Sequence, residues 1–169
     1  LEMTRMNQLS LGILAVSQGV MFLHAGSEFG YEKDGEHNSY NKPDSINSIK
    51  WELREKNAEI EQFVREMIAL RRNHPIFRLP SKEEVEERAF ILPQDRDHPH
   101  VIKYFLSGKD LEGEDWNNAL VVINPTGIAE VDLPEGGWKI EASNVRDNIG
   151  ESISGKIKLD KKEMVVLSN

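Results

Sequence analysis

A polar segment in the first third of the chain offers the side chains best suited to binding chemistry. Residues 26–56 show almost no apolar periodicity, and within them HNSYNKPDSINSIKW (His37–Trp51) concentrates Asn, Ser, Asp and Tyr before a Trp. Connections between elements have a median of about 4–6 residues, so this segment is far longer than a connector needs. Asp and Asn exchange hydrogen bonds with hydroxyl groups, and aromatic faces cover sugar rings. The composition suits a neutral polyhydroxyl ligand, although the same residues also build ordinary turns.

Other catalytic and metal chemistries find little support. The chain has no cysteine, which excludes disulfides, thiolate zinc sites and cysteine nucleophiles. His24, Glu28 and His37 have ligand side chains, but no H-E-x-x-H spacing exists, and EKDGEHNSYNKPD departs from the EF-hand pattern. No phosphate-binding Gly-rich loop is visible. We predict no metal site and no cofactor, with a structural calcium ion left open.

The elements flanking the polar segment have clear patterns. Helical spacing of apolar residues predicts a helix over residues 4–18, and the continuous apolar run VMFLH (Val20–His24) predicts a strand buried on both faces. A second helix follows, with Asn57 as its N-cap and Arg71 and Arg72 in its last turn, where they complement the helix dipole. Its apolar stripe consists of Ile60, Phe63, Val64, Met67 and Ile68.

The sequence pattern changes near residues 79–81, where the helical spacing of apolar residues ends. KEEVEER predicts a short solvated helical turn, and short alternating segments then predict strands separated by the turns NPTG, LPEGG and RDNIG. These strands are VIKYFL, ALVVIN, IAEVDL, WKIEA, KIKLD and MVVLS. The spacing is typical of an antiparallel β-sandwich over residues 80–169.

The first part poses a physical problem, because a doubly buried strand needs neighbours on both edges. Unpaired backbone groups cost about 1–3 kcal/mol each, and the sequence before Gly19 supplies no such strand. We therefore predict an α+β chain. Residues 1–79 are expected to form the closing strand and flanking helices of a larger α/β sheet or (β/α)8 barrel. The polar segment would then lie at the carboxyl ends of the strands, where such barrels place their active sites.

Bulk properties limit the partners. The chain has 169 residues, with 38% hydrophobic and 30% charged residues, enough for a folded core. Its net charge of −8 opposes binding to phosphate backbones, so no nucleic-acid partner is expected. No apolar run approaches the roughly 20 residues of a membrane span. The compartment, cytoplasmic or secreted, is not fixed by these properties.

The quoted motifs resemble a known family. SQGVMFLHAGSEFGYEKDGEHNSYNKPDSINSIKW is similar to the eighth-strand segment of type I pullulanases, in the α-amylase superfamily of glycoside hydrolases. MIALRRNHPIFRL resembles their last barrel helix and its exit, and ALVVINP and VDLPEGGWKI resemble their C-terminal sandwich. Isoamylase-type enzymes match less well over NSYNKPDSIN. Ser27 and the GYEK stretch (Gly30–Lys33) depart from the family pattern.

The resemblance implies retaining hydrolysis of α-1,6-glucosidic links in pullulan, branched starch or glycogen, with two carboxyl groups about 5–5.5 Å apart. In the family those carboxylates lie on earlier strands, so this chain is expected to hold no catalytic residue and to be inactive alone. It would need the missing N-terminal part of the same enzyme. Matching positions imply substrate contacts at Asp44 and Asn47, with Tyr40 lining the cleft or packing within the loop. Asn38 and Glu28 are expected to fix the loop.

Two alternatives stay open. Residues 80–169 alone could be a non-catalytic glucan-binding or scaffold module, with Trp116 or Trp138 as a sugar platform, although packing is the expected role of both. A regulatory interaction domain has only the acidic surface in its favour. Trp51 is expected to seal the polar segment against the barrel.

Overall fold

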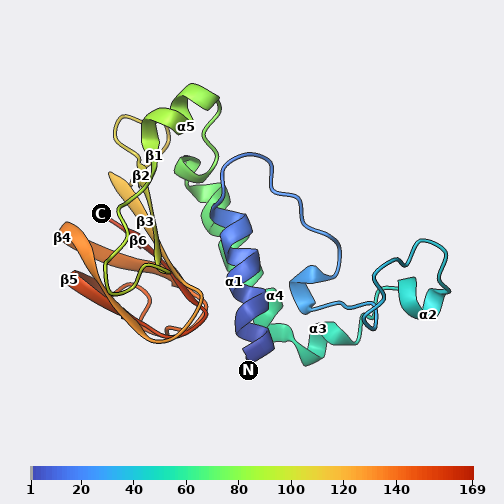
Figure 1. Ribbon diagram of the computed structural model, residues 1–169. Coiled ribbons are helices and arrows are strands. Elements are labelled where there is room, and N and C mark those ends of the chain that lie inside the picture. Colours follow the sequence, from blue (N-terminus) through green and yellow to red (C-terminus); the bar gives the residue numbers. More distant parts are fainter. Residues whose placement is uncertain (1) are drawn as a thin grey trace.

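The computed structural model describes residues 2–169 and confirms an α+β protein with an antiparallel sheet. Two long helices lie between the curved sheet on one side and the polar segment on the other (Figure 1). The helical elements are α1 (Glu2–Val16), η1 (Ser27–Phe29), α2 (Asp44–Asn47), α3 (Leu53–Lys56), α4 (Ala58–Asn73), η2 (Pro75–Phe77) and α5 (Lys82–Arg88). The strands are β1 (Ala89–Ile91), β2 (Ile102–Ser107), β3 (Asn118–Asn124), β4 (Ala129–Ser143), β5 (Ser152–Leu159) and β6 (Glu163–Ser168).

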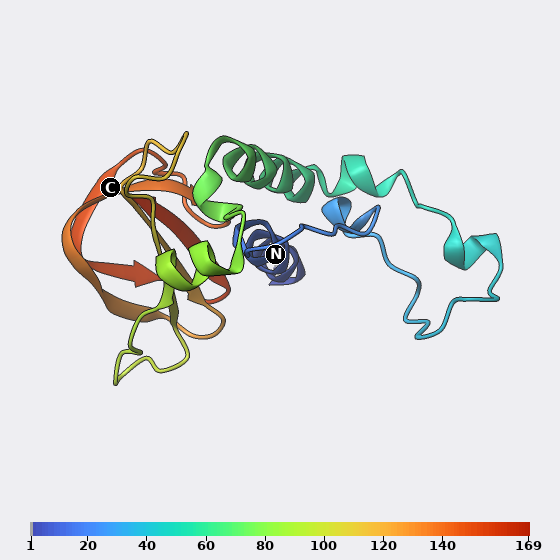
Figure 2. The ribbon, with the colours of Figure 1, turned by 90° about the horizontal axis from the view of Figure 1, so that it is seen from above.

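Helices α1 and α4 pack against each other along their length (Figures 1 and 2). The predicted apolar stripe of α4 is buried at four of its five positions, and Ile68 is half-buried. Asn57 occupies the N-cap position, but its side chain makes no capping hydrogen bond. Helix α1 ends at Val16, two residues before the predicted end, and this leaves Ser17, Gln18 and Gly19 as an exit segment. No helix within residues 2–169 has the length and apolar character to cross a membrane.

The six strands form one antiparallel sheet in the order β1-β2-β3-β6-β4-β5. The sheet curves strongly, so that its β4–β5 part turns over the rest (Figure 2). One apolar core, containing Leu120, Val131, Trp138 and Leu159, lies inside this curve. A second core lies between the sheet and the helices, where Val121 and Met164 meet Leu9 and Phe63. The helical part and the sheet therefore share a core.

In the sheet, one local prediction was wrong and one strand was missed. LPEGG was expected to be a turn between two strands, but β4 runs continuously through it, with a register shift between Asp132 and Gly137. Such an irregularity bends a strand without ending it, which explains how turn residues fit there. The three-residue strand β1, which follows α5 directly, was not predicted.

The segment Val20–His24 was expected to be a strand, and in this chain it forms none. Val20 and Phe22 are 97% and 80% exposed, whereas Met21 and Leu23 are half-buried against the helical core. The segment alternates as a strand would, but the described part of the chain gives it no strand to pair with. A hydrogen-bonded ladder needs neighbours, so the apolar run alone was not sufficient.

Candidate functional site

The polar segment projects away from the helices and the sheet, on the side opposite the sheet (Figure 1). It contains η1, α2 and α3, joined by turns and extended chain. An ion pair between the Lys50 Nζ and Asp34 Oδ1 atoms, 2.7 Å apart, links its two sides. This hydrogen bond to Asp34 raises the pKa of Lys50 above its ordinary value. The segment is therefore an ordered loop with its own internal contacts.

The root of the loop is fixed around η1. Gly26 adopts a left-handed conformation with φ 94°, and a Cβ there would lie 2.7 Å from the Cβ of Tyr31. The Gly26 N–H donates to Glu28 Oε2 at 2.8 Å. Phe29 is buried, and its carbonyl accepts from Asn57 Nδ2 at 2.9 Å. Glu28 thus holds a backbone amide, as expected from the sequence.

Asn47 acts as an internal brace of the loop. Its Nδ2 donates to the carbonyl oxygens of Ser39 and Lys42, both at 2.8 Å. Its Oδ1 accepts from Lys33 Nζ at 3.3 Å. Asn38 also binds within the loop, since its Oδ1 accepts from the Tyr40 N–H at 3.3 Å. The side-chain amide of Asn47 is therefore occupied, and this geometry favours a loop-fixing role over direct contact with a ligand.

Unlike the side-chain amide of Asn47, the side chains of Asp44 and Tyr40 are exposed and free of hydrogen bonds within residues 2–169. Asp44 is the first residue of α2 and is exposed; within residues 2–169 its carboxylate forms no hydrogen bond or ion pair. The Tyr40 side chain is 95% exposed, so it does not fill a core of the loop. Asp44 and Asn47 lie three residues apart on the short helix α2. The hydrogen bonds of the Asn47 side chain hold this helix against the rest of the loop. Of the three residues predicted to contact substrate, Asp44 and Tyr40 thus keep their carboxylate and phenol free for a ligand, whereas the Asn47 amide is occupied.

A groove lies between the extended segment and α4. Its lining includes Leu23, Glu28, Val64, Arg65 and Ile68. Trp51, expected to seal the loop, is 61% exposed and contacts Phe29 at a centroid distance of 5.8 Å. Trp51, Val20 and Phe22 are all exposed. The side of α4 that faces the loop is therefore an uncovered, partly apolar face.

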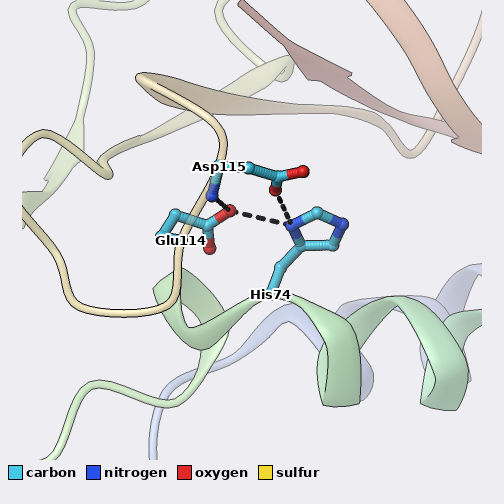
Figure 3. Close-up of side chains that lie close together, drawn as sticks. All are labelled: His74, Glu114 and Asp115. Carbon is cyan, nitrogen blue, oxygen red and sulfur yellow. Dashed lines mark hydrogen bonds and ion pairs between the residues drawn. The ribbon is translucent and has the colours of Figure 1, made fainter.

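One group of potential metal ligands exists within residues 2–169. The Nδ1 atom of His74 lies 2.8 Å from Glu114 Oε1 and 3.4 Å from Asp115 Oδ1 (Figure 3). The Glu114 side chain is fully buried, and the His74 ring stacks on Trp116 with centroids 3.5 Å apart. His24, Glu28 and His37 do not converge in this way.

Hydrogen bonds explain the Glu114 group without an ion. Glu114 Oε1 accepts from the N–H groups of Asp115 and Trp116, each at 3.1 Å, and Oε2 accepts from the Ile76 N–H at 3.0 Å. With His74 as a further donor, the lone pairs of Oε1 are used. Glu114 is therefore a polar link between η2 and the loop before β3. The structural calcium ion of the sequence analysis stays a prediction.

Sequence reasoning missed Glu114 and the buried Arg71. Nothing in EDW distinguishes Glu114 from a surface acid, because its partners come from a distant segment and from backbone amides. For Arg71 a signal existed: it lies four residues after Met67 and therefore continues the buried stripe of α4. An arginine at a core position predicts a set of buried acceptors.

Comparisons with known proteins agree with this architecture. The chain is 36% identical over 115 residues to a pullulanase of Bacillus subtilis, a match that covers 68% of this chain and 16% of that protein. A GlgX homologue of Mycobacterium tuberculosis is 29% identical over 127 residues, or 64% of this chain and 18% of that protein. No protein-family model matches the sequence.

Solved structures give the same result over nearly the whole chain. A pullulanase from Anoxybacillus in complex with maltotetraose superposes with a TM-score of 0.87 at 29% identity, over 98% of this chain and 23% of that one. A type I pullulanase from Bacillus subtilis in complex with maltose gives 0.86 at 29% identity, over 98% and 23%.

The chain is similar in sequence and in fold to debranching enzymes of the glycoside hydrolases. Within that class it is pullulanase-like, since pullulanases match it both in sequence and in fold. The chain spans about one sixth to one quarter of the length of these relatives.

Proposed function

We propose that this chain is the C-terminal portion of a debranching enzyme that hydrolyses α-1,6-glucosidic links of an α-glucan by a retaining mechanism. Residues 1–79 would supply the closing strand and flanking helices of a (β/α)8 barrel, and residues 80–169 a C-terminal β-sandwich. The catalytic carboxylates would lie in the remaining, N-terminal part of the same enzyme. The similarity to pullulanases, some of them solved with maltose or maltotetraose, supports this assignment.

The extended segment after α1 supports the barrel. Val20 and Phe22 point to solvent, while Met21 and Leu23 rest on the helices. Side chains that are apolar on both faces suit a strand enclosed by neighbours and helices. Strands from the rest of the enzyme would cover Val20 and Phe22 and supply the missing hydrogen bonds.

The observation that carries the substrate assignment is the free Asp44 carboxylate on a braced loop. Because Asn47 already uses its amide inside the loop, Asp44 and Tyr40 are the two of the three predicted contact residues whose polar groups stay available to a sugar. A carboxylate accepts hydrogen bonds from sugar hydroxyls, and such a bond contributes about 0.5–1.5 kcal/mol, more where a charge takes part. We assign Asp44 to direct substrate contact, Tyr40 to an aromatic contact and Asn47 to support.

Kinetics of the complete enzyme on pullulan test this assignment. Asp44→Ala should lower kcat/KM by about tenfold, the equivalent of roughly 1.4 kcal/mol, with an unchanged melting temperature. Asn47→Ala should lower both activity and melting temperature, because it removes the brace. Ser45→Ala, on the exposed side of the same helix, is the matched control and should change neither. Normal kinetics with a lowered melting temperature for Asp44→Ala would reassign that residue to the loop structure.

The isolated 169-residue chain should hydrolyse no α-1,6 link. Robust hydrolysis by this chain alone, in a preparation shown by mass spectrometry to be free of longer enzyme, would refute the assignment of the carboxylates to another part.

The alternative of a non-catalytic glucan-binding module is weakened by its aromatic residues. Trp138 is 1% exposed, as predicted for a packing role. Trp116 is half-buried and stacks on His74, with the edge of Phe77 beside it. Neither side chain forms an open platform.

A further inference from the structure

The buried guanidinium of Arg71 gathers four carbonyl oxygens. Its side chain is almost fully buried near the end of α4 and forms no ion pair within residues 2–169. Desolvation by burial lowers the pKa of Arg71, though an arginine stays charged in proteins. Its bonds to carbonyl oxygens are to Ala15 at 2.9 Å, Ser17 at 2.7 Å, Gly19 at 2.5 Å and Phe77 at 2.7 Å.

Three of these carbonyls belong to the exit of α1. The last carbonyls of a helix lack intrahelical partners and carry the negative end of the helix dipole, so a cation is favourable there. The planar guanidinium can serve several acceptors at fixed angles, which an ammonium group cannot do equally well. Arg71 therefore sets both the position and the direction in which the chain leaves α1.

Gln18 ties the same exit to the segment after α4. Its Nε2 donates to the Ile76 carbonyl at 2.9 Å and lies 3.3 Å from the Tyr104 hydroxyl. Its Oε1 accepts from the Leu79 N–H at 3.0 Å. Residues 17–19 are thus held against residues 76–79 by two side chains, that of Gln18 from the exit segment and that of Arg71 from α4.

These contacts end where the extended segment begins. Gly19 has φ 87°, and the next residue, Val20, is 97% exposed. At the far end, the Gly26–Glu28 and Asn57–Phe29 hydrogen bonds fix the root of the loop. The extended segment therefore runs between two fixed points, and a displacement of the first changes the path by which the chain reaches the root of the loop.

We propose that Arg71 and Gln18 are positioning residues for substrate binding, which act by fixing the point from which the segment carrying the Asp44 loop departs. This inference rests on the proposed function of that loop. Neither side chain would touch the glucan. A loss of positioning should therefore raise KM and lower kcat/KM in the complete enzyme, as groups displaced by about 1 Å lose catalytic efficiency by up to roughly a hundredfold.

The test compares Arg71→Lys, Arg71→Met and Gln18→Ala with wild type in the complete enzyme, using pullulan as substrate. Arg71→Lys keeps the charge but not the planar set of donors. We expect it to raise KM by about three- to tenfold, and Arg71→Met to raise it further. Gln18→Ala should act in the same direction. Arg96→Lys, at an exposed arginine, is the matched control and should leave KM unchanged.

A second control separates positioning from stability. Leu120→Ala removes a fully buried side chain from the sheet core that faces away from the helices, and should lower the melting temperature without raising KM. If Arg71→Lys loses stability but keeps the wild-type KM, the positioning role is refuted. If wild type itself fails to cleave pullulan, the proposed function is refuted instead. Hydrogen exchange in the 169-residue chain gives an independent readout. The Ser17 amide, which donates to the Ile13 carbonyl at 3.0 Å, and the Leu79 amide, which donates to Gln18 Oε1 at 3.0 Å, should exchange faster in Arg71→Lys, and unchanged rates would also overturn the proposal.

Discussion

Replacement of Trp138 by alanine should strongly destabilise the chain. Trp138 lies in β4, 1% exposed, inside the curve of the sheet. The edge of its ring meets Phe105 at a centroid distance of 6.4 Å, and its indole N–H donates to the Pro134 carbonyl at 3.0 Å. The residue therefore combines core packing, an aromatic pair and a satisfied hydrogen-bond donor.

The expected loss for Trp138→Ala is about 3–5 kcal/mol, the range for deleting a large aromatic side chain from a core. For a chain of this size, each 1 kcal/mol shifts the melting temperature by about 2–4 °C, which gives a decrease of roughly 6–20 °C. Trp138→Phe keeps most of the ring volume but loses the hydrogen bond to Pro134. It should cost about 1–2 kcal/mol.

Urea unfolding of the 169-residue chain, followed by far-ultraviolet circular dichroism, measures these losses. The slope of free energy against urea should stay constant, so that a lower midpoint reports stability alone. Trp51→Ala makes the same substitution at a side chain that is 61% exposed, and should cost less than about 1 kcal/mol. Equal losses at both tryptophans would refute the argument from core burial.

Two further predictions concern buried acids. Burial raises the pKa of the Glu163 carboxyl above its ordinary value, despite its contact with Arg146. The folded state then holds this proton more tightly than the unfolded chain, so the resulting stabilisation is complete at low pH and is lost as the pH rises through the folded-state pKa. In urea unfolding, the free energy of unfolding of wild type should fall relative to that of Glu163→Gln as the pH rises from 4 to 7. A difference between the two proteins that stays constant with pH would contradict the raised pKa. Glu114→Ala should cost at least about 3 kcal/mol in urea unfolding because it leaves three N–H groups without acceptors, whereas Asp115→Ala, at a carboxylate 84% exposed, should stay within about 0.5 kcal/mol. Similar losses for these last two variants would contradict the linking role of Glu114.

Local periodicity was enough to predict most elements. The stripe of α4 is buried as its pattern indicates, and the apolar runs of β3 and β6 form strands that are buried on both faces. The LPEGG stretch failed because Pro134, Gly136 and Gly137 occupy an irregular part of β4, where turn residues are tolerated. A single sequence does not separate a strand that bends from a strand that ends.

Contacts between residues far apart in the sequence could not be predicted from local patterns either. The sequence places Asp44 ahead of Asn47 as a substrate contact and leaves loop bracing open for Asn47, and the loop geometry then separates the free carboxylate from the braced amide. Glu114 and Gln18 bind backbone groups tens of residues away, and such partners leave no mark in local composition. The apolar run at Val20–His24 predicts a strand enclosed by neighbouring strands. The described part of the chain contains no strand that pairs with it.

The place of β6 in the sheet has a consequence for the order in which this chain can acquire its structure during synthesis. β6 is the last strand along the chain, yet it lies between β3 and β4 and pairs with both. Until β6 leaves the ribosome, β1–β3 and the β4–β5 pair are two separate units with open edges. Helix α1 also lacks its contact with Met164 of β6, which packs against Gly12. Nascent chains therefore carry unpaired strand edges and uncovered apolar faces until β6 has been made, which is the interval in which chaperones would be needed most.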